Sequence, residues 1–108
     1  MDIKYTELIE EEIIQLLDLY EQLEQNEEKI NEFKVKEIWK IIKSHNIKYF
    51  IAKNNGKIIS SCYICIIPNF TRNVKFIRFI ENVITDKEYR RKGIGRKVIN
   101  NAIEYAKR

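Results

Sequence analysis

The chain has 108 residues, of which 44% are hydrophobic and 33% are charged, a mixture that is typical of a folded globular protein and excludes a disordered one. We expect one domain spanning residues 1–108, because two domains of half this length would each be too small to bury a good core. The formal net charge is +4, with acids mainly between Glu7 and Glu37 and bases dominant from Arg72 onward, which indicates an anionic partner for the C-terminal half.

Two amphipathic helices are predicted in the first part of the chain. The first covers residues 11–24, where apolar side chains recur at helical spacing: Ile13, Leu16, Leu17, Tyr20 and Leu23. The polar residues 25–32 predict a loop. The second helix has an apolar face at positions i, i+3, i+4 and i+7, namely Val35, Ile38, Trp39 and Ile42, and is expected to end before Ser44. The lone His45 then lies in a loop, where a solvated side chain is a better interpretation than a catalyst or a ligand.

The hydrophobic pattern then changes to that of β-strands. Residues 49–52 and 57–67 are rich in β-branched and aromatic side chains, and Asn54-Asn55-Gly56 between them favours a tight hairpin. Pro68 ends the second strand, residues 69–73 predict a turn, and residues 74–85 predict a third strand. Tyr49 and Tyr63 in these strands, and Tyr89 after them, are candidates for either the core or a cleft.

Cys62 and Cys65 form a lone C-x-x-C within the second of these strands. Residues i and i+3 of a strand point to opposite faces, so the pair is poorly placed to bind one metal ion. We therefore expect two buried thiols and no metal site.

A glycine-containing turn, Tyr89-Arg90-Arg91-Lys92-Gly93-Ile94-Gly95-Arg96-Lys97, separates the last strand from a third helix. That helix has its apolar stripe at Ile94, Val98, Ile99, Ala102, Ile103 and Ala106. The predicted order is therefore helix, helix, three strands, glycine turn, helix, which is an α/β (α+β) fold with a mainly antiparallel sheet.

Three interpretations of the glycine turn are open. The glycines alone are explained by a tight connection between strand and helix, but that leaves the surrounding cations without a role. A nucleotide-binding motif fails, because the P-loop pattern is absent and Val98 stands where a dinucleotide site needs its third glycine. A pyrophosphate cradle explains both features, since the first N–H groups of a helix lack internal partners and attract anions. On this interpretation, larger residues at Gly93 and Gly95 would hold the ligand away.

Arg90-Arg91-Lys92-Gly93-Ile94-Gly95 fits the pattern R/Q-x-x-G-x-G/A and resembles the acetyl-CoA signature of the Gcn5-related N-acetyltransferases (GNAT). Residues 67–72 and 80–85 are similar to segments of bacterial members, and the order of elements agrees with that family. The resemblance implies an acetyl-CoA-dependent enzyme that acetylates a primary amine of a small molecule or peptide by direct attack. It also implies the fold, a GNAT-like mixed sheet flanked by helices.

The resemblance implies a cofactor site as well. The pantetheine arm would pair with the backbone of Val83, Ile84 and Thr85. The phosphates would lie on the amides of residues 91–96. The complete set of cofactor-binding candidates is Val83, Ile84, Thr85, Arg90, Arg91, Lys92, Gly93, Ile94, Gly95, Arg96 and Lys97.

Glu81 is the candidate general base, acting on the amine through water. It precedes Val83 and Thr85 by two and four residues, so regular alternation places all three on one face. A salt bridge to Arg78 and a charge that positions the substrate are alternative roles.

The chain departs from the family pattern after its third helix, because family members continue with a further strand, a helix and closing strands. We therefore expect either a piece of a longer protein or a naturally shortened form. In both cases the given residues lack the usual source of the general acid and leave the strand at 74–85 with an open edge. A homodimer through that edge is predicted.

Other functions stay open at this point. The chain would also suit a non-catalytic acyl-CoA-binding fragment. A small basic nucleic-acid-binding domain is a weaker alternative, because aromatic residues are not interleaved with the bases after Arg90.

The partner and the location are less closely defined. Acidic residues near the first loop, which are Glu21, Glu24, Glu27 and Glu28, favour a cationic amine. No apolar run approaches the ~20 residues of a membrane-spanning helix, and no signal peptide is evident, so we expect a cytoplasmic protein with no membrane partner.

Overall fold

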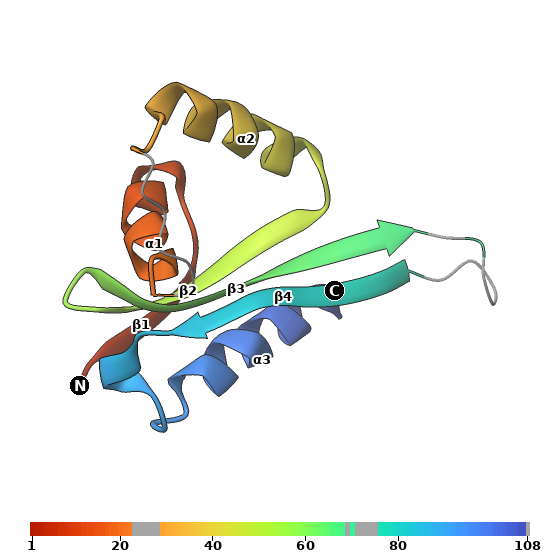
Figure 1. Cartoon of the computed structure of the whole chain (residues 1–108). Coiled ribbons are helices and arrows are strands. Elements are labelled where there is room, and N and C mark those ends of the chain that lie inside the picture. The colour runs from red at the N-terminus through yellow and green to blue at the C-terminus, as the bar shows by residue number, and fades with distance from the viewer. Residues whose placement is uncertain (23–28, 69, 71–75, 108) are drawn as a thin grey trace.

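A four-stranded sheet forms the centre of the computed structural model, which describes residues 1–22, 29–68, 70 and 76–107 (Figure 1). The strands are antiparallel and lie in the order β1-β2-β3-β4. They are β1 (Ile3–Glu7), β2 (Ile47–Asn54), β3 (Lys57–Pro68) and β4 (Phe76–Thr85). Within the described part of the chain β4 is an edge strand, as expected, and the dimer inferred from that edge stays a prediction.

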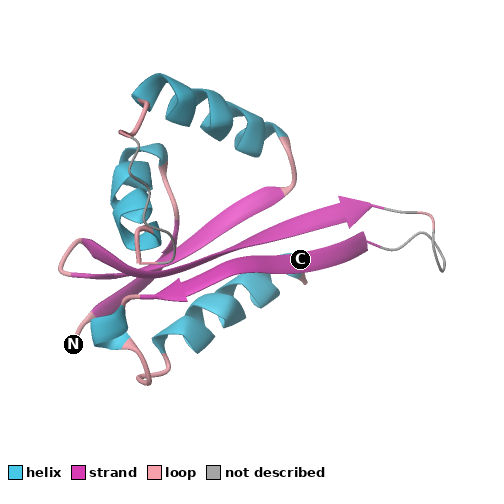
Figure 2. Cartoon of the chain, in the orientation of Figure 1, coloured by secondary structure: helices cyan, strands magenta, loops and turns pink. Residues whose placement is uncertain are grey.

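Helices cover both faces of this sheet (Figures 1 and 2). One face carries α1 (Ile13–Tyr20) and α2 (Glu32–Ser44), and the other carries α3 (Ile94–Ala106). Short 3-10 turns, η1 (Glu10–Glu12) and η2 (Lys87–Tyr89), precede α1 and α3. The predicted fold of an antiparallel sheet flanked by helices is confirmed.

The predicted order of elements was wrong in one respect, because it lacked β1. Ile3 and Tyr5 are the only apolar residues of this short strand, so the sequence gives a weak signal. Its partner β2 lies more than forty residues away, with Ile3 opposite Asn54 and Glu7 opposite Phe50. Whether such a short strand forms depends more on its pairing with a distant strand than on the β-propensity of its own residues.

The other boundaries agree closely with the sequence. Helix α1 begins two residues later than predicted and ends at Tyr20, before the predicted end. The predicted end at residue 24 lies outside the described residues, as do half of the predicted loop 25–32 and most of the turn 69–73. The hairpin between β2 and β3 turns through Asn55 and Gly56, which have φ angles of 51° and 79°. These left-handed angles are what the Asn-Asn-Gly sequence predicted.

The core is divided by the sheet into two clusters. On the α3 face, Val98 and Ala102 pack against residues of β2 and β3 such as Ala52 and Ile64. On the opposite face, α1 residues pack against Ile51, Ile58 and Ile84. Each strand therefore supplies alternate side chains to two different layers.

The start of α1 is fixed by a buried acid that the sequence analysis did not single out. Glu12 is 8% exposed, and its carboxylate accepts a hydrogen bond from the Ile9 N–H at 3.1 Å and contacts Lys53 Nζ at 2.6 Å. The contact joins η1 to β2. Removing either partner would leave a poorly solvated charge.

Helix α2 is held much more loosely than α1 or α3. Asn31 caps its first turn by accepting from the N–H groups of Phe33 and Lys34. None of its residues is buried.

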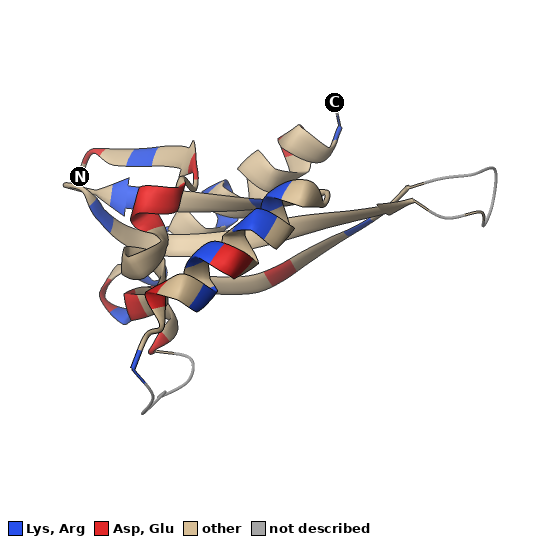
Figure 3. Ribbon diagram, turned by 90° about the horizontal axis from the view of Figure 1, so that it is seen from above, with Lys and Arg blue, Asp and Glu red and all other residues tan. Residues whose placement is uncertain are grey.

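Figure 3 shows this side of the molecule, where acidic and basic residues are interspersed rather than separated by sign.

Candidate active site

The turn from β4 into α3 is organised by Asp86, a residue that the sequence analysis missed. Its side chain accepts from the Glu88 N–H at 3.0 Å, and its own N–H donates to the Ile59 carbonyl at 2.7 Å. Hydrogen bonding from Glu88, aided by Lys57 at 3.6 Å, holds the pKa of Asp86 below its usual value although burial opposes this. An aspartate directly before a short helical turn was the available signal.

The backbone then bends sharply through two left-handed positions. Arg91 has φ 65° and Gly93 has φ 77°. Arg90 stabilises the approach to this bend, because its Nε donates to the Thr85 carbonyl at 3.0 Å. Gly93 is the N-cap of α3 and has no side chain to offer the helix, so the first turn is left uncapped.

The first amides of α3 are available to a ligand. Lys97 is the first residue whose N–H bonds back into the helix, to Gly93 O at 3.2 Å. The N–H groups of Ile94, Gly95 and Arg96 have no acceptor among the described residues. Unpaired amides at a helix start bind phosphates, because they carry the positive end of the helix dipole.

The same turn and the start of α3 carry four exposed cations, namely Arg91, Lys92, Arg96 and Lys97. Two of them lie over aromatic rings, Lys92 Nζ at 5.6 Å from the Tyr89 centroid and Lys97 Nζ at 5.8 Å from that of Tyr5. Such contacts restrain the side chains without neutralising them. The turn therefore has the charge and the free donors that a diphosphate requires.

The structure gives each of the two glycines of the turn a requirement of its own. A Cβ on Gly93 would meet nothing within 4 Å, so the requirement there is the left-handed φ angle. A Cβ on Gly95 would lie 2.9 Å from Thr85 Oγ1. The absence of a side chain at Gly95 therefore lets α3 approach β4, and the expectation that larger residues at Gly93 and Gly95 would hold a ligand away stays a prediction.

Strand β4 contains a bulge near the predicted general base. Ser61 lies opposite Ile84 but Tyr63 lies opposite Glu81, so β4 has one residue more than β3 in this interval. Asn82 within the bulge has φ 50°. Bulges of this kind re-aim side chains and leave backbone groups unpaired.

The bulge overturns part of the prediction for Glu81. Thr85 faces α3, where its Oγ1 lies 2.9 Å from Ser60 Oγ. Glu81 pairs with Tyr63 on the face of α1 and α2, so Glu81 and Thr85 are on opposite faces rather than the same one. The alternative salt bridge to Arg78 is also wrong, because Arg78 is on the α3 face and its Nε donates to the Ala106 carbonyl at 3.0 Å.

A group of tyrosines lies beside Glu81 on the face of α1 and α2. Tyr49 and Tyr63 have ring centroids 5.0 Å apart. Burial, and then the Glu81 carboxylate, raise the pKa of Tyr63, and burial followed by Tyr63 raises that of Tyr49. Burial also raises the pKa of Tyr20, whose buried hydroxyl has no hydrogen-bond partner among the described residues. Tyr49 and Tyr63 thus line the half-buried surface next to Glu81.

The remaining candidates lie outside this site. Tyr89 is half-buried against the α3 core and accepts from Asn54 Nδ2 at 3.0 Å. Cys62 is buried on the α3 face and burial raises its pKa to about 11, whereas Cys65 is only partly buried, contrary to expectation. His45 is exposed, with Nδ1 2.7 Å from the Ile41 carbonyl. Among the described residues no group of three metal-ligating side chains was found.

Comparison with known proteins decides the family. Residues 11–108 match the sequence profile of the acetyltransferase (GNAT) family. The chain belongs to the GNAT family.

One relative of this GNAT chain is named glucosamine 6-phosphate N-acetyltransferase and comes from Trypanosoma brucei brucei. It is 33% identical over 60 residues, which are 56% of this chain and 41% of the relative. The chain therefore aligns with less than half the length of that curated relative.

Solved structures of similar fold include a Trypanosoma brucei acetyltransferase, with a TM-score of 0.89 at 24% identity, covering 98% of this chain and 75% of that one. A putative acetyltransferase from Agrobacterium tumefaciens has a TM-score of 0.84 at 29% identity, with 95% and 72% covered. Glucosamine-6-phosphate N-acetyltransferase from Arabidopsis thaliana has a TM-score of 0.89 at 21% identity, covering 99% of this chain and 76% of that one.

No helix in the described part of the GNAT chain is long and apolar enough to cross a membrane.

Proposed function

We propose that this GNAT chain is an N-acetyltransferase that moves the acetyl group of acetyl-CoA to a primary amine by direct attack. The observation that supports this most strongly is the first turn of α3. It offers the amides of Ile94, Gly95 and Arg96, which have no acceptor among the described residues, and it carries four exposed cations. These are the groups that a CoA pyrophosphate would need.

The proposed path of the donor continues along β4. Its pantetheine arm would lie against Val83, Ile84 and Thr85, at the edge of the described sheet. The bulge at Asn82 marks the end of this path, since it interrupts regular pairing with β3. Backbone donors near the bulge are the candidates for stabilising the thioester oxygen as negative charge develops on it.

The acceptor amine would approach from the face of α1 and α2, where Glu81 lies beside Tyr63. Glu81 is the proposed base that receives the amine proton, directly or through water. The amine nitrogen then forms a bond to the acetyl carbon and the carbon–sulfur bond breaks. The leaving thiolate takes up a proton, and the residue that donates it is not assigned.

The first experiment is calorimetric titration of acetyl-CoA, comparing the wild type with a Lys92→Gln, Arg96→Gln double variant. We expect saturable binding that the variant weakens by roughly tenfold or more, because two charge-assisted contacts are lost. A Lys40→Gln variant on α2 serves as the control for charge. Equal binding by all three proteins would contradict the proposed cradle.

Turnover is tested next by chromatographic detection of free CoA with a panel of amines. Glucosamine 6-phosphate is the first acceptor to try, because two similar proteins carry that activity in their names. Glu81→Gln should lower kcat by about 10²-fold or more if Glu81 is the base, and Glu104→Gln on α3 is the control. Binding without turnover of any amine would instead support the non-catalytic alternative.

A further inference from the structure

Two buried hydroxyl groups without a hydrogen-bond partner lie together beside the bulge of β4. They are Tyr20 Oη and Ser61 Oγ, the two buried side-chain atoms of the described residues that lack such a partner. Ser61 is fully buried, with Ile51 of β2 opposite it on one side and Ile84 of β4 on the other. Tyr20 is the last residue of α1 and packs against the same core cluster. Both hydroxyls therefore lie between α1 and the sheet, on the face that carries Glu81.

The Tyr20 hydroxyl is also close to Asn82, the left-handed residue of the bulge. Burial, and after it Tyr49, raises the pKa of Tyr20. The side chains of Ser61 and Asn82 act against this rise, which places both of them beside the hydroxyl. Neither makes a hydrogen bond of ordinary geometry with it. Hydrogen bonds at active sites are often long or poorly aligned without substrate, and they tighten when it binds.

The fold by itself does not need a hydroxyl group at position 20. Burying a hydroxyl without a partner costs free energy, and a phenylalanine would fill the same space without that cost. Polar groups that stay unpaired in a native core, like strained backbone, are often found at functional sites. The place of Tyr20, next to the bulge that follows the proposed base, indicates a role in the reaction.

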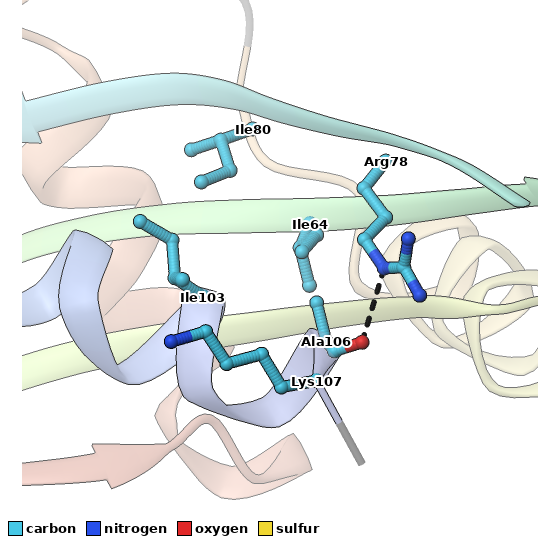
Figure 4. Close-up of a pocket in the computed structure, with 6 residues that line it drawn as sticks. All are labelled: Ile64, Arg78, Ile80, Ile103, Ala106 and Lys107. Atoms are coloured by element: carbon cyan, nitrogen blue, oxygen red, sulfur yellow. Dashed lines mark hydrogen bonds between the residues drawn. The ribbon is translucent and has the colours of Figure 1, made fainter.

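Strand β4 is fastened to its neighbours on both sides of the bulge. Before the bulge, Arg78 Nε donates to the Ala106 carbonyl of α3 at 3.0 Å (Figure 4). After it, Ser60 Oγ donates to the Ile84 carbonyl at 2.9 Å. Between these two anchors the regular pairing with β3 is interrupted. The conformation of the bulge therefore depends on the groups that hold Asn82.

We propose that Tyr20 is a positioning residue for the acetyl transfer, which it serves by forming a hydrogen-bonded chain with Ser61 and Asn82. The chain fixes the left-handed turn at Asn82 and thereby the direction of Glu81, which directly precedes it. It also fixes the backbone groups of the bulge that are candidates for stabilising the thioester oxygen. Because its hydroxyl is buried, Tyr20 acts through Asn82 and not on the substrate. This role rests on the proposed function, since it concerns the same site.

The kinetic test replaces Tyr20 with phenylalanine, which removes the hydroxyl and keeps the ring. We expect kcat to fall about tenfold, because a small misplacement of a catalytic group has an effect of this size or larger. The KM for acetyl-CoA should stay within about twofold, since the phosphates would bind at the start of α3. Tyr105→Phe is the matched control, because Tyr105 is a partly buried tyrosine on the opposite face of the sheet. It should leave both constants unchanged.

A second substitution shows whether Tyr20 acts through Asn82. Glycine at position 82 accepts the φ angle of 50° without support from a side chain. Tyr20→Phe should therefore lower kcat about tenfold in the wild type but have little effect in an Asn82→Gly background. Equal losses in the two backgrounds would overturn the positioning role, because Tyr20 would then act independently of Asn82.

Nuclear magnetic resonance relaxation dispersion follows the bulge directly, since it detects exchange between conformations on the microsecond to millisecond timescale. In the wild type and in Tyr105→Phe, acetyl-CoA should suppress such exchange at the amides of Glu81, Asn82 and Val83. In Tyr20→Phe the exchange should persist when acetyl-CoA is bound. Urea unfolding of the same proteins shows whether any loss of activity follows a loss of stability instead.

The outcomes separate the positioning role from the proposed function. If the wild type binds and uses acetyl-CoA but Tyr20→Phe has the same kcat, the role of Tyr20 is wrong and the proposed function stands. If Tyr20→Phe loses activity only in proportion to its unfolded fraction, the residue serves the fold and the role is again overturned. If no CoA thioester binds to the folded protein, the proposed function fails and the role of Tyr20 fails with it.

Discussion

The contact between Gly95 and Thr85 gives a test of how α3 is seated on the sheet. A methyl group at Gly95 would lie 2.9 Å from Thr85 Oγ1, where ordinary contacts begin at 3.4 Å. Thr85 cannot easily yield, because its Oγ1 is within hydrogen-bond distance of Ser60 Oγ at 2.9 Å. The Gly95→Ala change therefore forces a shift of helix against strand.

The expected magnitude combines two opposing effects. Overpacking of a tight contact costs about 1–3 kcal/mol, whereas alanine is favoured over glycine within a helix by up to about 1 kcal/mol. We expect Gly95→Ala to lower the free energy of unfolding by about 1–2 kcal/mol. In a Thr85→Ala background the clash is absent, so the same change should be neutral or stabilising.

The assay is urea unfolding followed by far-UV circular dichroism on the four proteins of this double-mutant cycle. A coupling energy of about 1–3 kcal/mol between the two positions is predicted. Effects that add to within about 0.5 kcal/mol would refute the reasoning. So would a Gly95→Ala variant more stable than the wild type, because the close approach of α3 would then have no energetic consequence.

Three further predictions concern single groups of the fold. The folded-state pKa of Asp86 is lowered, so its carboxylate stabilises the fold above the unfolded pKa of 3.8. This stabilisation is lost as pH falls through the folded pKa. The difference in unfolding free energy between wild type and Asp86→Asn, measured by urea unfolding, should therefore disappear below about pH 4. Cys62, with a pKa of about 11 and full burial, should resist iodoacetamide at pH 8 while Cys65 is modified, and mass spectrometry of peptides would expose the reverse order. Gly93→Ala should cost about 1–2 kcal/mol of unfolding free energy for its left-handed angle and Gly93→Asn less, so equal losses in thermal or urea unfolding would argue against that angle.

Much of the fold could be predicted from the sequence, because its signals are local. The apolar stripes of α2 and α3 have helical period, and Asn55 and Gly56 dictate the hairpin turn by their backbone preferences. The glycine turn was recognisable for the same reason. Each of these features is decided within a few neighbouring residues.

The errors have a common physical cause in non-local pairing. Strand β1 exists because β2 offers it an edge, and its own two apolar residues could not indicate that. At the bulge near Asn82, β4 has one residue more than β3 between two paired positions, and this register depends on both strands together. The role of Gly95 likewise depends on a threonine of another element. Functional geometry at this site is therefore set by contacts between elements.

The bulge in β4 also affects how related sequences should be aligned. Odd-numbered residues face α1 and α2 before Asn82, whereas even-numbered residues such as Ile84 do so after it. A relative with one residue fewer at this point would keep its acid on the same face, three rather than four positions before the residue that matches Thr85. Counting a fixed number of residues back from the glycine turn would then assign the wrong residue of the relative as the acid. Pairing with β3, in particular the position opposite Tyr63, is the sounder guide to the acid in such relatives.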